Sequence, residues 1–295
     1  MNRPLIRSLF ATLMALVLAD AARCELVATQ KGSKLKIKGA PESDSIQLDG
    51  TGSIGRVLVS QAGVNPQAFL GVFDIEISTG TGNDQVFVNG IEIGGSLVVN
   101  TGDGVDQVDI DNTRLDGLAF PVMIGKNVTL RLGGYVGEQV DVDTEDEAGF
   151  LIGGNTTIEG ASDIDLNGDG TDPNYVVGDI LLCGDLRIKV DEALDQNGDA
   201  HSIDLDNVVV GGATRLKLSN RNDATGNDFV RIKRSSFVRN FEANLRAGND
   251  ELHFDALPSK FGADFVVCGG AGENVVLGAQ SITVAGATKF TDVEQ

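Results

Sequence analysis

Apolar and polar residues alternate at a period of two in many short stretches of this chain, and glycine-rich turns separate the stretches. Leu35-Lys36-Ile37-Lys38-Gly39, Ser45-Ile46-Gln47-Leu48 and Phe73 to Ile77 are early examples. This alternation is typical of half-buried β-strands. Apolar residues at helical spacing with proper caps are nearly missing, and Asp191 to Leu194 suffices for one turn at most. The pattern therefore predicts an all-β chain.

One phrase recurs along the chain: a glycine turn, an acidic residue and then alternating apolar residues. Its clearest copy is Thr79-Gly80-Thr81-Gly82-Asn83-Asp84-Gln85-Val86-Phe87-Val88, and the next copy places Asp106 at an offset of 106 − 84 = 22 residues. Paired glycines, as in Ile93-Gly94-Gly95-Ser96-Leu97, mark a second recurring phrase between the copies. Later copies of the first phrase lie at 133–142, 225–232, 247–254 and 270–277, with a degenerate one at 156–166.

This internal similarity indicates a solenoid, in which each unit buries its apolar face by stacking on its neighbours. Three strands of ~5 residues each, with their turns, account for a unit of two to three dozen residues. We predict a right-handed parallel β-helix of about eight irregular coils, with a β-sandwich as the runner-up because evenly spaced strands also suit that fold. Val, Ile and Leu should fill the core, for example Val86, Val108, Val140, Val230 and Leu252.

The predicted organisation is a signal peptide at 1–21, an N-terminal cap or first strand at 22–39 and a single β-helix domain at 40–295. Within the last of these, Ser281 to Val293 should supply the final strands, and Glu25 to Gly39 should begin or cap the stack.

The first residues have the pattern of a targeting segment. Arg3 and Arg7 form a basic region, Leu9 to Leu18 an apolar one, and Ala19-Asp20-Ala21 supplies small residues for a signal peptidase. We expect cleavage near Ala21 and export to the periplasm, the cell surface or the medium. A lipoprotein ending at Cys24 is the alternative. No later run approaches the roughly 18 apolar residues of a membrane span, so we expect no integral membrane segment in the mature chain.

Composition narrows the function classes. Asp and Glu number 43 against 23 Lys and Arg, which gives a formal net charge of -20. A field of this sign repels nucleic acid and favours cations, so nucleic-acid binding is excluded. Trp is absent and Tyr occurs only twice, which disfavours a carbohydrate enzyme with aromatic platforms. Of the three cysteines, Cys183 and Cys268 lie beside glycine in apolar strand-like contexts, and we expect both to be buried and unpaired, although an oxidising destination permits a disulfide.

The phrases Thr79-Gly80-Thr81-Gly82-Asn83-Asp84 and Ala247-Gly248-Asn249-Asp250 resemble single copies of the calcium-binding RTX-type nonapeptide. The region from Leu35 to Val293 resembles the secreted parallel β-helix proteins of environmental bacteria. The RTX family repeats its motif in tandem every nine residues, whereas this chain has one copy per long coil, often with Thr-Gly or Ala-Gly in place of the first glycine pair. The resemblance implies a β-helix and a calcium cofactor.

The acidic positions of the phrase are the first candidate metal ligands: Asp84, Asp106, Asp228 and Asp250, with Glu138 as a variant. In stacked coils, equivalent carboxylates lie about 4.8 Å apart. At that distance two charges repel by roughly 1 kcal/mol in water and about 3–4 kcal/mol at an effective dielectric near 20. Two interpretations stay open: a cation bridges them, or each carboxylate ties its own turn by accepting backbone N–H groups.

Two acidic stretches that we expect to be protruding loops provide further candidates. Asp165-Leu166-Asn167-Gly168-Asp169-Gly170-Thr171-Asp172 begins like an EF-hand loop, but Val176 stands at its twelfth position. The opening recurs 195 − 165 = 30 residues later in Asp195-Gln196-Asn197-Gly198-Asp199, without the glycine at position six. The candidate calcium ligands are Asp165, Asn167, Asp169, Asp172, Asp195, Asn197 and Asp199.

No catalytic residue is assigned. His201 and His253 have no recognisable nucleophile partner, and we expect both on the surface. Two functions remain: an exported, non-enzymatic structural or adhesion-type protein with calcium as its expected cofactor, which binds a cell-surface polymer or itself, and a pectate-lyase-like polysaccharide lyase or hydrolase. The second would need a basic residue beside clustered acids on one strand face, for which the candidates are Arg215, Lys217, Arg231, Lys233 and Arg234.

Overall fold

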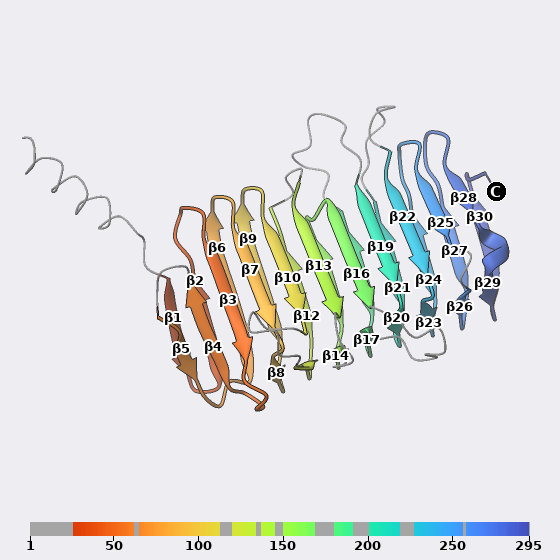
Figure 1. Ribbon diagram of the computed structural model, residues 1–295. Coiled ribbons are helices and arrows are strands. Elements are labelled where there is room, and N and C mark those ends of the chain that lie inside the picture. Colours follow the sequence, from red (N-terminus) through yellow and green to blue (C-terminus); the bar gives the residue numbers. More distant parts are fainter. Residues whose placement is uncertain are drawn as a thin grey trace, which may run out of the picture.

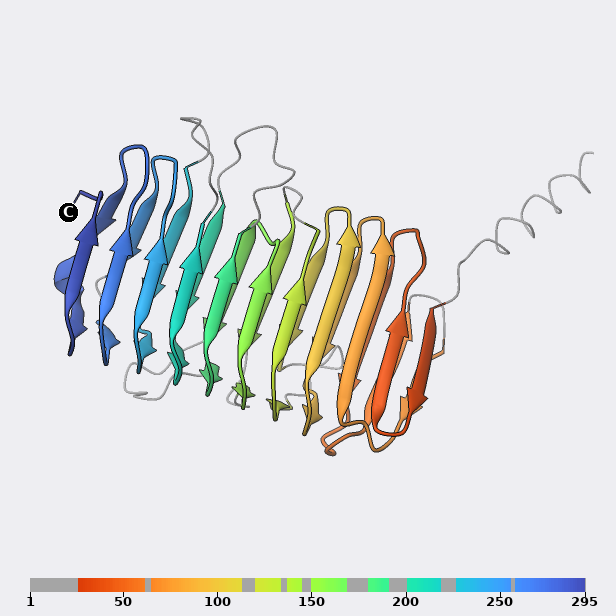
Figure 2. The same cartoon turned by 180° about the vertical axis from the view of Figure 1, so that it is seen from behind.

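The computed structural model describes residues 26–61, 65–112, 120–133, 137–144, 150–168, 180–190, 201–218, 227–255 and 258–294. These residues form one elongated stack of short strands, which runs in chain order from one end to the other (Figure 1). The view from behind shows a second layer of strands facing the first (Figure 2). Three sheets, here named A, B and C, make up the stack.

The bounds of the strands follow from the alternation of apolar and polar residues. Sheet A contains β1 (Val27–Lys31), β2 (Lys34–Lys38), β6 (Asp74–Thr81), β9 (Leu97–Asp103), β12 (Val128–Arg131), β15 (Thr156–Glu159), β18 (Leu186–Lys189), β21 (Thr214–Lys217), β24 (Phe241–Asn244), β27 (Phe265–Cys268) and β30 (Thr288–Thr291). Sheet B contains β3 (Ser45–Gly50), β4 (Val57–Gln61), β5 (Gln67–Phe69), β7 (Gln85–Asn89), β10 (Gln107–Asp111), β13 (Gln139–Thr144), β16 (Asp163–Gly168), β19 (Ser202–Asp206), β22 (Phe229–Lys233), β25 (Glu251–Phe254) and β28 (Val275–Leu277). Sheet C contains β8 (Glu92–Ile93), β11 (Val122–Ile124), β14 (Phe150–Ile152), β17 (Ile180–Leu182), β20 (Val208–Val210), β23 (Ser236–Phe237), β26 (Ser259–Phe261) and β29 (Ile282–Val284).

The chain passes from sheet A to B to C and back to A, and each strand pairs in parallel with its equivalent one coil later. From β6–β7–β8 to β27–β28–β29, the described residues form eight complete three-strand coils. The predicted parallel β-helix of about eight coils is therefore confirmed, and the β-sandwich is wrong. Coil length varies while register holds: Ile75 pairs with Leu97 at an offset of 97 − 75 = 22 residues, and Leu97 with Val128 at 128 − 97 = 31.

Both ends of the stack are covered by the chain itself. At the N-terminal end, β1 pairs antiparallel with β2, and β4 and β5 extend sheet B antiparallel beyond β3. The first described strands, β1 and β2, thus lie at this end of the stack, whereas the antiparallel hairpin of β4 and β5 was not predicted. At the other end, a 3-10 helix (Ala279–Ser281) and a bridge between Val275 and Glu294 follow the last turns. The short antiparallel pieces at the N-terminal end reduce edge-to-edge pairing of exposed strands.

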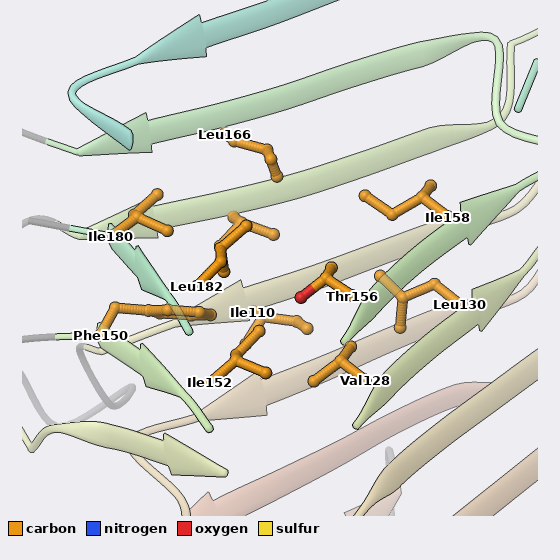
Figure 3. A pocket seen from close by; sticks show the side chains of 11 residues that line it. Ile110, Val128, Leu130, Phe150, Ile152, Thr156, Ile158, Leu166, Ile180 and Leu182 are labelled. Atoms are coloured by element: carbon orange, nitrogen blue, oxygen red, sulfur yellow. The ribbon is translucent and has the colours of Figure 1, made fainter. Parts of the chain in front are cut away.

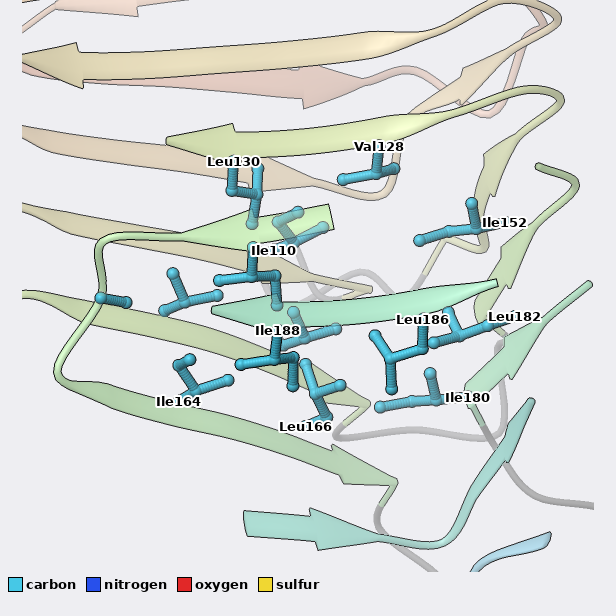
Figure 4. Close-up of a cluster of buried hydrophobic side chains, with 14 of the residues drawn as sticks. Ile110, Val128, Leu130, Ile152, Ile164, Leu166, Ile180, Leu182, Leu186 and Ile188 are labelled. Atoms are coloured by element: carbon cyan, nitrogen blue, oxygen red, sulfur yellow. The ribbon is translucent and has the colours of Figure 1, made fainter. Parts of the chain in front are cut away.

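Apolar side chains from all three sheets point inward and stack in columns (Figure 4). The predicted core residues Val86, Val108, Val140, Val230 and Leu252 are all buried, which confirms the predicted interior. Where the core loosens, it encloses a cavity of about 10 Å³, and Figure 3 shows the side chains around it, among them Thr156. This space approaches the minimum for one water molecule, but its wall is almost entirely apolar.

The two described cysteines depart from expectation. Cys183 is exposed and Cys268 is half-buried, and both are free thiols. The prediction that both are buried is wrong, because each side chain follows an inward-facing residue by one position and so belongs to the outer surface. They are nevertheless unpaired, as expected.

Phenylalanine replaces the aliphatic residues of the core toward the C-terminal end. Phe237, Phe241, Phe254, Phe261 and Phe265 are all buried. The Phe261 ring lies at the centre of the group, with ring centroids 4.6 to 5.9 Å from those of the other four. Aromatic pairs at such distances add about 0.5–1.5 kcal/mol beyond area burial.

Replacing this central ring should have a large effect. We expect Phe261→Ala to lower the free energy of unfolding by about 3–5 kcal/mol, because it removes four ring contacts and leaves a cavity between stacked coils. Chemical denaturation followed by circular dichroism measures the change. Phe73→Ala is the control, since Phe73 is 39% exposed, and we expect it to cost less than about 1.5 kcal/mol. Equal losses in the two variants would contradict a packed aromatic core.

Candidate functional site

One side-chain position at the corner between sheets A and B is polar in every coil. It immediately precedes each parallel strand of sheet B, and the register of those strands aligns its members in a column. All of them are buried. We call this column the corner ladder, and its residues are Asp44, Asp84, Asp106, Glu138, Ser162, His201, Asp228, Asp250 and Asn274.

Hydrogen bonds between coils explain the polar character of the ladder. The N–H of Asp44 donates to Asp84 Oδ1 at 2.7 Å, and the N–H of Asp84 donates to Asp106 Oδ1 at 2.9 Å. The same contact joins Asp228 to Asp250 at 3.0 Å and Asp250 to Asn274 at 3.2 Å. Asp84, Asp106, Asp250 and Asn274 therefore tie the backbone of the preceding coil. The interpretation that each aspartate bonds its own turn is wrong for the first three, whereas Asp44 does accept the N–H of Ala40 in its own turn at 2.7 Å.

Burial dominates the electrostatics of the ladder. It raises the pKa of Asp84, against the opposing effects of the Thr79 hydroxyl and the Asp44 N–H. It raises the pKa of Asp250 to about 6, with the neighbouring Asp228 charge adding to the shift and the N–H of Asp228 and nearby His201 opposing it. The second oxygens of Asp84, Asp106 and Asp250 have no hydrogen-bond partner within the described part of the chain. Each of these carboxylates accepts a backbone N–H from the preceding coil and is buried.

His201 interrupts the run of carboxylates near the middle of the stack. Its side chain is 5% exposed, and its Nδ1 lies 2.8 Å from Asp228 Oδ1. The same oxygen accepts the backbone N–H of His201 at 3.2 Å. The expectation that His201 lies on the surface is wrong, because the residue occupies a buried position in the corner ladder and its ring hydrogen-bonds to the carboxylate of Asp228. His253, on the outer face of sheet B, is about one-third exposed.

The raised pKa of Asp250 predicts a pH-dependent contribution to stability. Folding favours the protonated acid, so the stabilisation present below pH about 4 is lost as the pH rises through about 6. Asp250→Asn keeps an acceptor oxygen and removes the charge, as Asn274 already does one coil later. We expect it to raise the free energy of unfolding by about 1–2 kcal/mol near pH 7, with a gain that shrinks toward pH 4.

Asp250→Ala serves as the matched control, because it removes the acceptor as well as the charge. We expect this variant to be less stable than Asp250→Asn at every pH, since the Asp228 N–H then has no partner in a buried corner. Chemical denaturation at several pH values measures both effects. A gain for the asparagine variant that did not change with pH would contradict the assigned charge effect.

A second set of acidic residues lies on the outer face of sheet B, and we call it the acidic rows. The first row contains Asp109, Asp141, Asp165 and Asp204, and the second contains Asp111, Asp143, Asn167 and Asp206; each residue is paired in register with the next. Neighbours along a row are about 4.8 Å apart. The rows therefore place seven carboxylates and one amide on four adjacent strands.

Repulsion within the rows is strongest at their centre. Burial raises the pKa of Asp165 to about 6, and the charges of Asp204, Asp141 and Asp143 add to the shift. Burial also raises the pKa of Asp141, with Asp163 contributing. Asp165 Oδ1 and Asp204 Oδ1 are shielded from solvent and have no hydrogen-bond partner among the described residues. The rows thus concentrate negative charge on one outer face of sheet B.

Basic residues terminate both rows at the next strand. Arg231 continues the first row and binds Asp204, and Lys233 continues the second row and lies 2.6 Å from Asp206. Arg234 Nε donates to Asp206 Oδ1 at 2.8 Å. Arg215 and Lys217 lie on β21 of sheet A instead. The structure therefore brings three of the five basic candidates to the acidic rows and leaves two elsewhere.

The predicted calcium ligands divide into three groups. Asp84, Asp106, Asp228 and Asp250 occupy the corner ladder, whereas Asp165 and Asn167 belong to the acidic rows. Both of the latter lie inside strand β16, so the expectation that they stand in a protruding loop is wrong. Asp169, Asp172, Asp195, Asn197 and Asp199 lie outside the described residues.

Sequence reasoning missed most of the acidic rows. Asp109, Asp141 and Asp204 were not singled out, although each begins an Asp-x-Asp pair in a period-two stretch. That spacing puts both carboxylates on one outer face of a strand, and repetition in successive coils aligns them. Among the residues that the structure describes, no three His, Cys, Asp or Glu side chains converge in a group that could hold a metal ion.

Comparison with models of known protein families, with curated proteins and with solved structures found no match. In the described part of the chain, no helix has the length and apolar character needed to cross a membrane.

Proposed function

We propose that this chain is an exported, non-enzymatic β-solenoid that serves as a structural or adhesion-type protein outside the cytoplasm. The observation that carries the proposal is the uninterrupted register of the three sheets over eight coils. Each coil repeats the same roles: inward apolar columns, a corner residue that ties its neighbour, and an outer face. This regularity supports a rigid rod whose outer faces make the functional contacts, with a cell-surface polymer or another copy of the chain as the partner.

The acidic rows support calcium as a stabilising cofactor. Carboxylate and amide oxygens are the ligands that calcium prefers, and Asp165 Oδ1 and Asp204 Oδ1 have no other partner among the described residues. The side chains are not already gathered into a group of three. We therefore propose weak binding at neighbouring carboxylates, with water supplying the remaining ligands. A bound cation would offset the repulsion by Asp204, Asp141 and Asp143 that adds to the effect of burial on the pKa of Asp165.

Thermal melting in EDTA and in millimolar calcium tests this cofactor. We expect calcium to raise the melting temperature by about 3 °C or more, because it binds only the stacked carboxylates of the folded state. In Asp165→Asn, the temperature in EDTA should exceed that of the wild type, since a repelled charge is gone. The further rise on adding calcium should be smaller than in the wild type.

Glu242→Gln is the control for this experiment. Glu242 is an exposed acid on the outer face of sheet A, away from the acidic rows. It should leave both the melting temperature in EDTA and the calcium response near the wild-type values. A wild-type melting temperature that is the same in EDTA and calcium would refute the calcium proposal while leaving the structural role intact.

A lyase acting on acidic polysaccharides is the second candidate, and one observation favours it. Arg231 lies on the same sheet face as the acidic rows, and β25 brings His253 beside it in register. A basic side chain next to acids that can recruit calcium is the arrangement that abstraction of a proton from a uronic acid needs. Against this role, the Arg231 guanidinium is bound to Asp204, which holds it in the charged form.

Incubation with polygalacturonate or alginate in the presence of calcium separates the two functions. Under the structural proposal we expect no unsaturated product by ultraviolet absorbance from the wild type or from Arg231→Ala. Product from the wild type that disappears in Arg231→Ala and persists in Arg215→Ala would establish the lyase instead. Arg215 is suited to the control because it lies on sheet A, beside Asp185.

A further inference from the structure

The outer face of sheet C differs from the rest of this acidic protein because its central part carries no charge. The middle, outward-facing residues of its strands form a row in register: Glu92, Met123, Leu151, Leu181, Val209, Ser236, Lys260 and Thr283. Four successive members of this row are apolar. One acid lies at the N-terminal end and one base near the C-terminal end, and neither forms a salt bridge within the described residues.

A second outward row runs beside the first, two residues further along the chain in each coil. From Gly125 onward, the backbone N–H groups of this row donate to carbonyl oxygens of the preceding coil at 2.7 to 2.9 Å. A Cβ added at Gly125 would lie 2.6 Å from the carbonyl oxygen of Gly94, so glycine at position 125 lets these two coils approach closely. Cys183 and Val238 are the large exceptions, and Val238 is 52% exposed. The members are Gly94, Gly125, Gly153, Cys183, Gly211, Val238, Gly262 and Ala285.

Two copies of this face are complementary in charge and shape when one copy lies on the other with its coil order reversed about the coil that contains Leu181. A twofold axis along the strand direction of β17 would place the coil that contains Leu181 in one copy on the same coil of the other copy, with the order of the coils reversed. Glu92, three coils before Leu181, then faces Lys260, three coils after it. Both copies make this contact, so the dimer contains two equivalent pairs of opposite charge.

The same operation matches large side chains with small ones. Met123 faces Ser236, and in the second row Val238 faces Gly125. Gly125 lies in a hollow of about 210 Å³ whose wall includes Ile54, Met123 and Leu151. The exposed Val238 of one copy therefore enters the hollow of the other, while Leu181 and Cys183 each face their own equivalent.

The size of the face is adequate for a weak, specific interface. Seven strands ~4.8 Å apart and a width of about five residues give roughly 550 Å² per copy, or about 1,100 Å² in total. The formal net charge of -20 on each copy opposes association elsewhere on the surface, and this face is where that repulsion is smallest.

We propose that two copies of this chain dimerise through the outer face of sheet C, antiparallel and centred on Leu181. The interface is isologous, as in most cyclic dimers. Charge complementarity between Glu92 and Lys260 selects this arrangement over the parallel one, in which Glu92 would face Glu92 and Lys260 would face Lys260. The proposal concerns assembly and stands whether or not calcium binds.

Sedimentation equilibrium of the full chain over a wide concentration range tests dimerisation. We expect a monomer–dimer equilibrium in the micromolar range. Leu181→Asp should abolish it, because each copy would place a carboxylate at the twofold axis. Val266→Asp is the control, since Val266 points outward from β27 of sheet A and should leave dimerisation unchanged. A monomer at all concentrations, or loss of the dimer in both variants, would overturn the proposal.

Charge reversal tests the antiparallel orientation. Glu92→Lys alone should raise the dimer dissociation constant roughly tenfold, because two attractive contacts become repulsive. The double variant Glu92→Lys with Lys260→Glu should return it to within about threefold of the wild type. A parallel dimer would show no such recovery, so a double variant as weak as the single one overturns this geometry.

Thiol cross-linking gives an independent measure of the central contact. A short bismaleimide should join two copies through Cys183, which is exposed and lies on the coil that contains the axis. Cys183→Ser should remove the covalent dimer and Cys268→Ser should retain it. Covalent dimers that depend on Cys268 instead would place the interface on sheet A and overturn the proposal.

Discussion

Each coil of this protein is joined to the next by backbone ladders in three sheets and by side chains that accept N–H groups across the coil boundary. The corner ladder is the fullest example, but the return corner from sheet C to sheet A uses the same device. There the N–H of Asn155 donates to Asn127 Oδ1 at 2.9 Å, and the N–H of Asp185 donates to Asn155 Oδ1 at 3.0 Å. The N–H groups bonded in the corner ladder are buried, and a buried N–H without a partner costs about 1–3 kcal/mol. The Asp and Asn residues of the turns therefore hold the stack together at its weakest points.

Aspartate has two roles here, and its surroundings separate them. In the corner ladder it is buried and accepts a fixed backbone donor, as Asp84 does for Asp44. In the acidic rows it lies on the outer face of a regular strand, paired in register with other carboxylates along most of each row. The first role joins neighbouring coils, whereas the second brings like charges together. Sequence reasoning treated both as one class of candidate metal ligand, because both are aspartates that recur once per coil.

The sequence predicted the architecture well because the fold repeats its signals. Alternating apolar residues and the glycine–acid phrase occur in nearly every coil, so an irregular copy such as that at Thr156 to Leu166 was still recognised. The antiparallel hairpin of β4 and β5 escaped prediction because it occurs once and has no second copy for comparison. The surface position of Cys183 and the burial of His201 depend on a shift of one residue in register, which alternation alone leaves open near a turn. The acidic rows needed the coil offsets before Asp109, Asp141, Asp165 and Asp204 could be aligned.

The constancy of register despite variable coil length has a consequence for how such a chain can change. The offset between paired residues is 40 from Leu35 to Ile75 and 22 from Ile75 to Leu97, yet the strands rise by the same step. The longer offset includes β4 and β5, which extend sheet B beyond β3, and the register of β2, β6 and β9 in sheet A is kept. The number of residues in a coil thus does not set the rise per coil along the stack. Foreign segments can therefore be inserted at the corners, where they would be spaced at fixed intervals along the stack. Residues added to a coil therefore lengthen that coil without changing the spacing between the stacked strands.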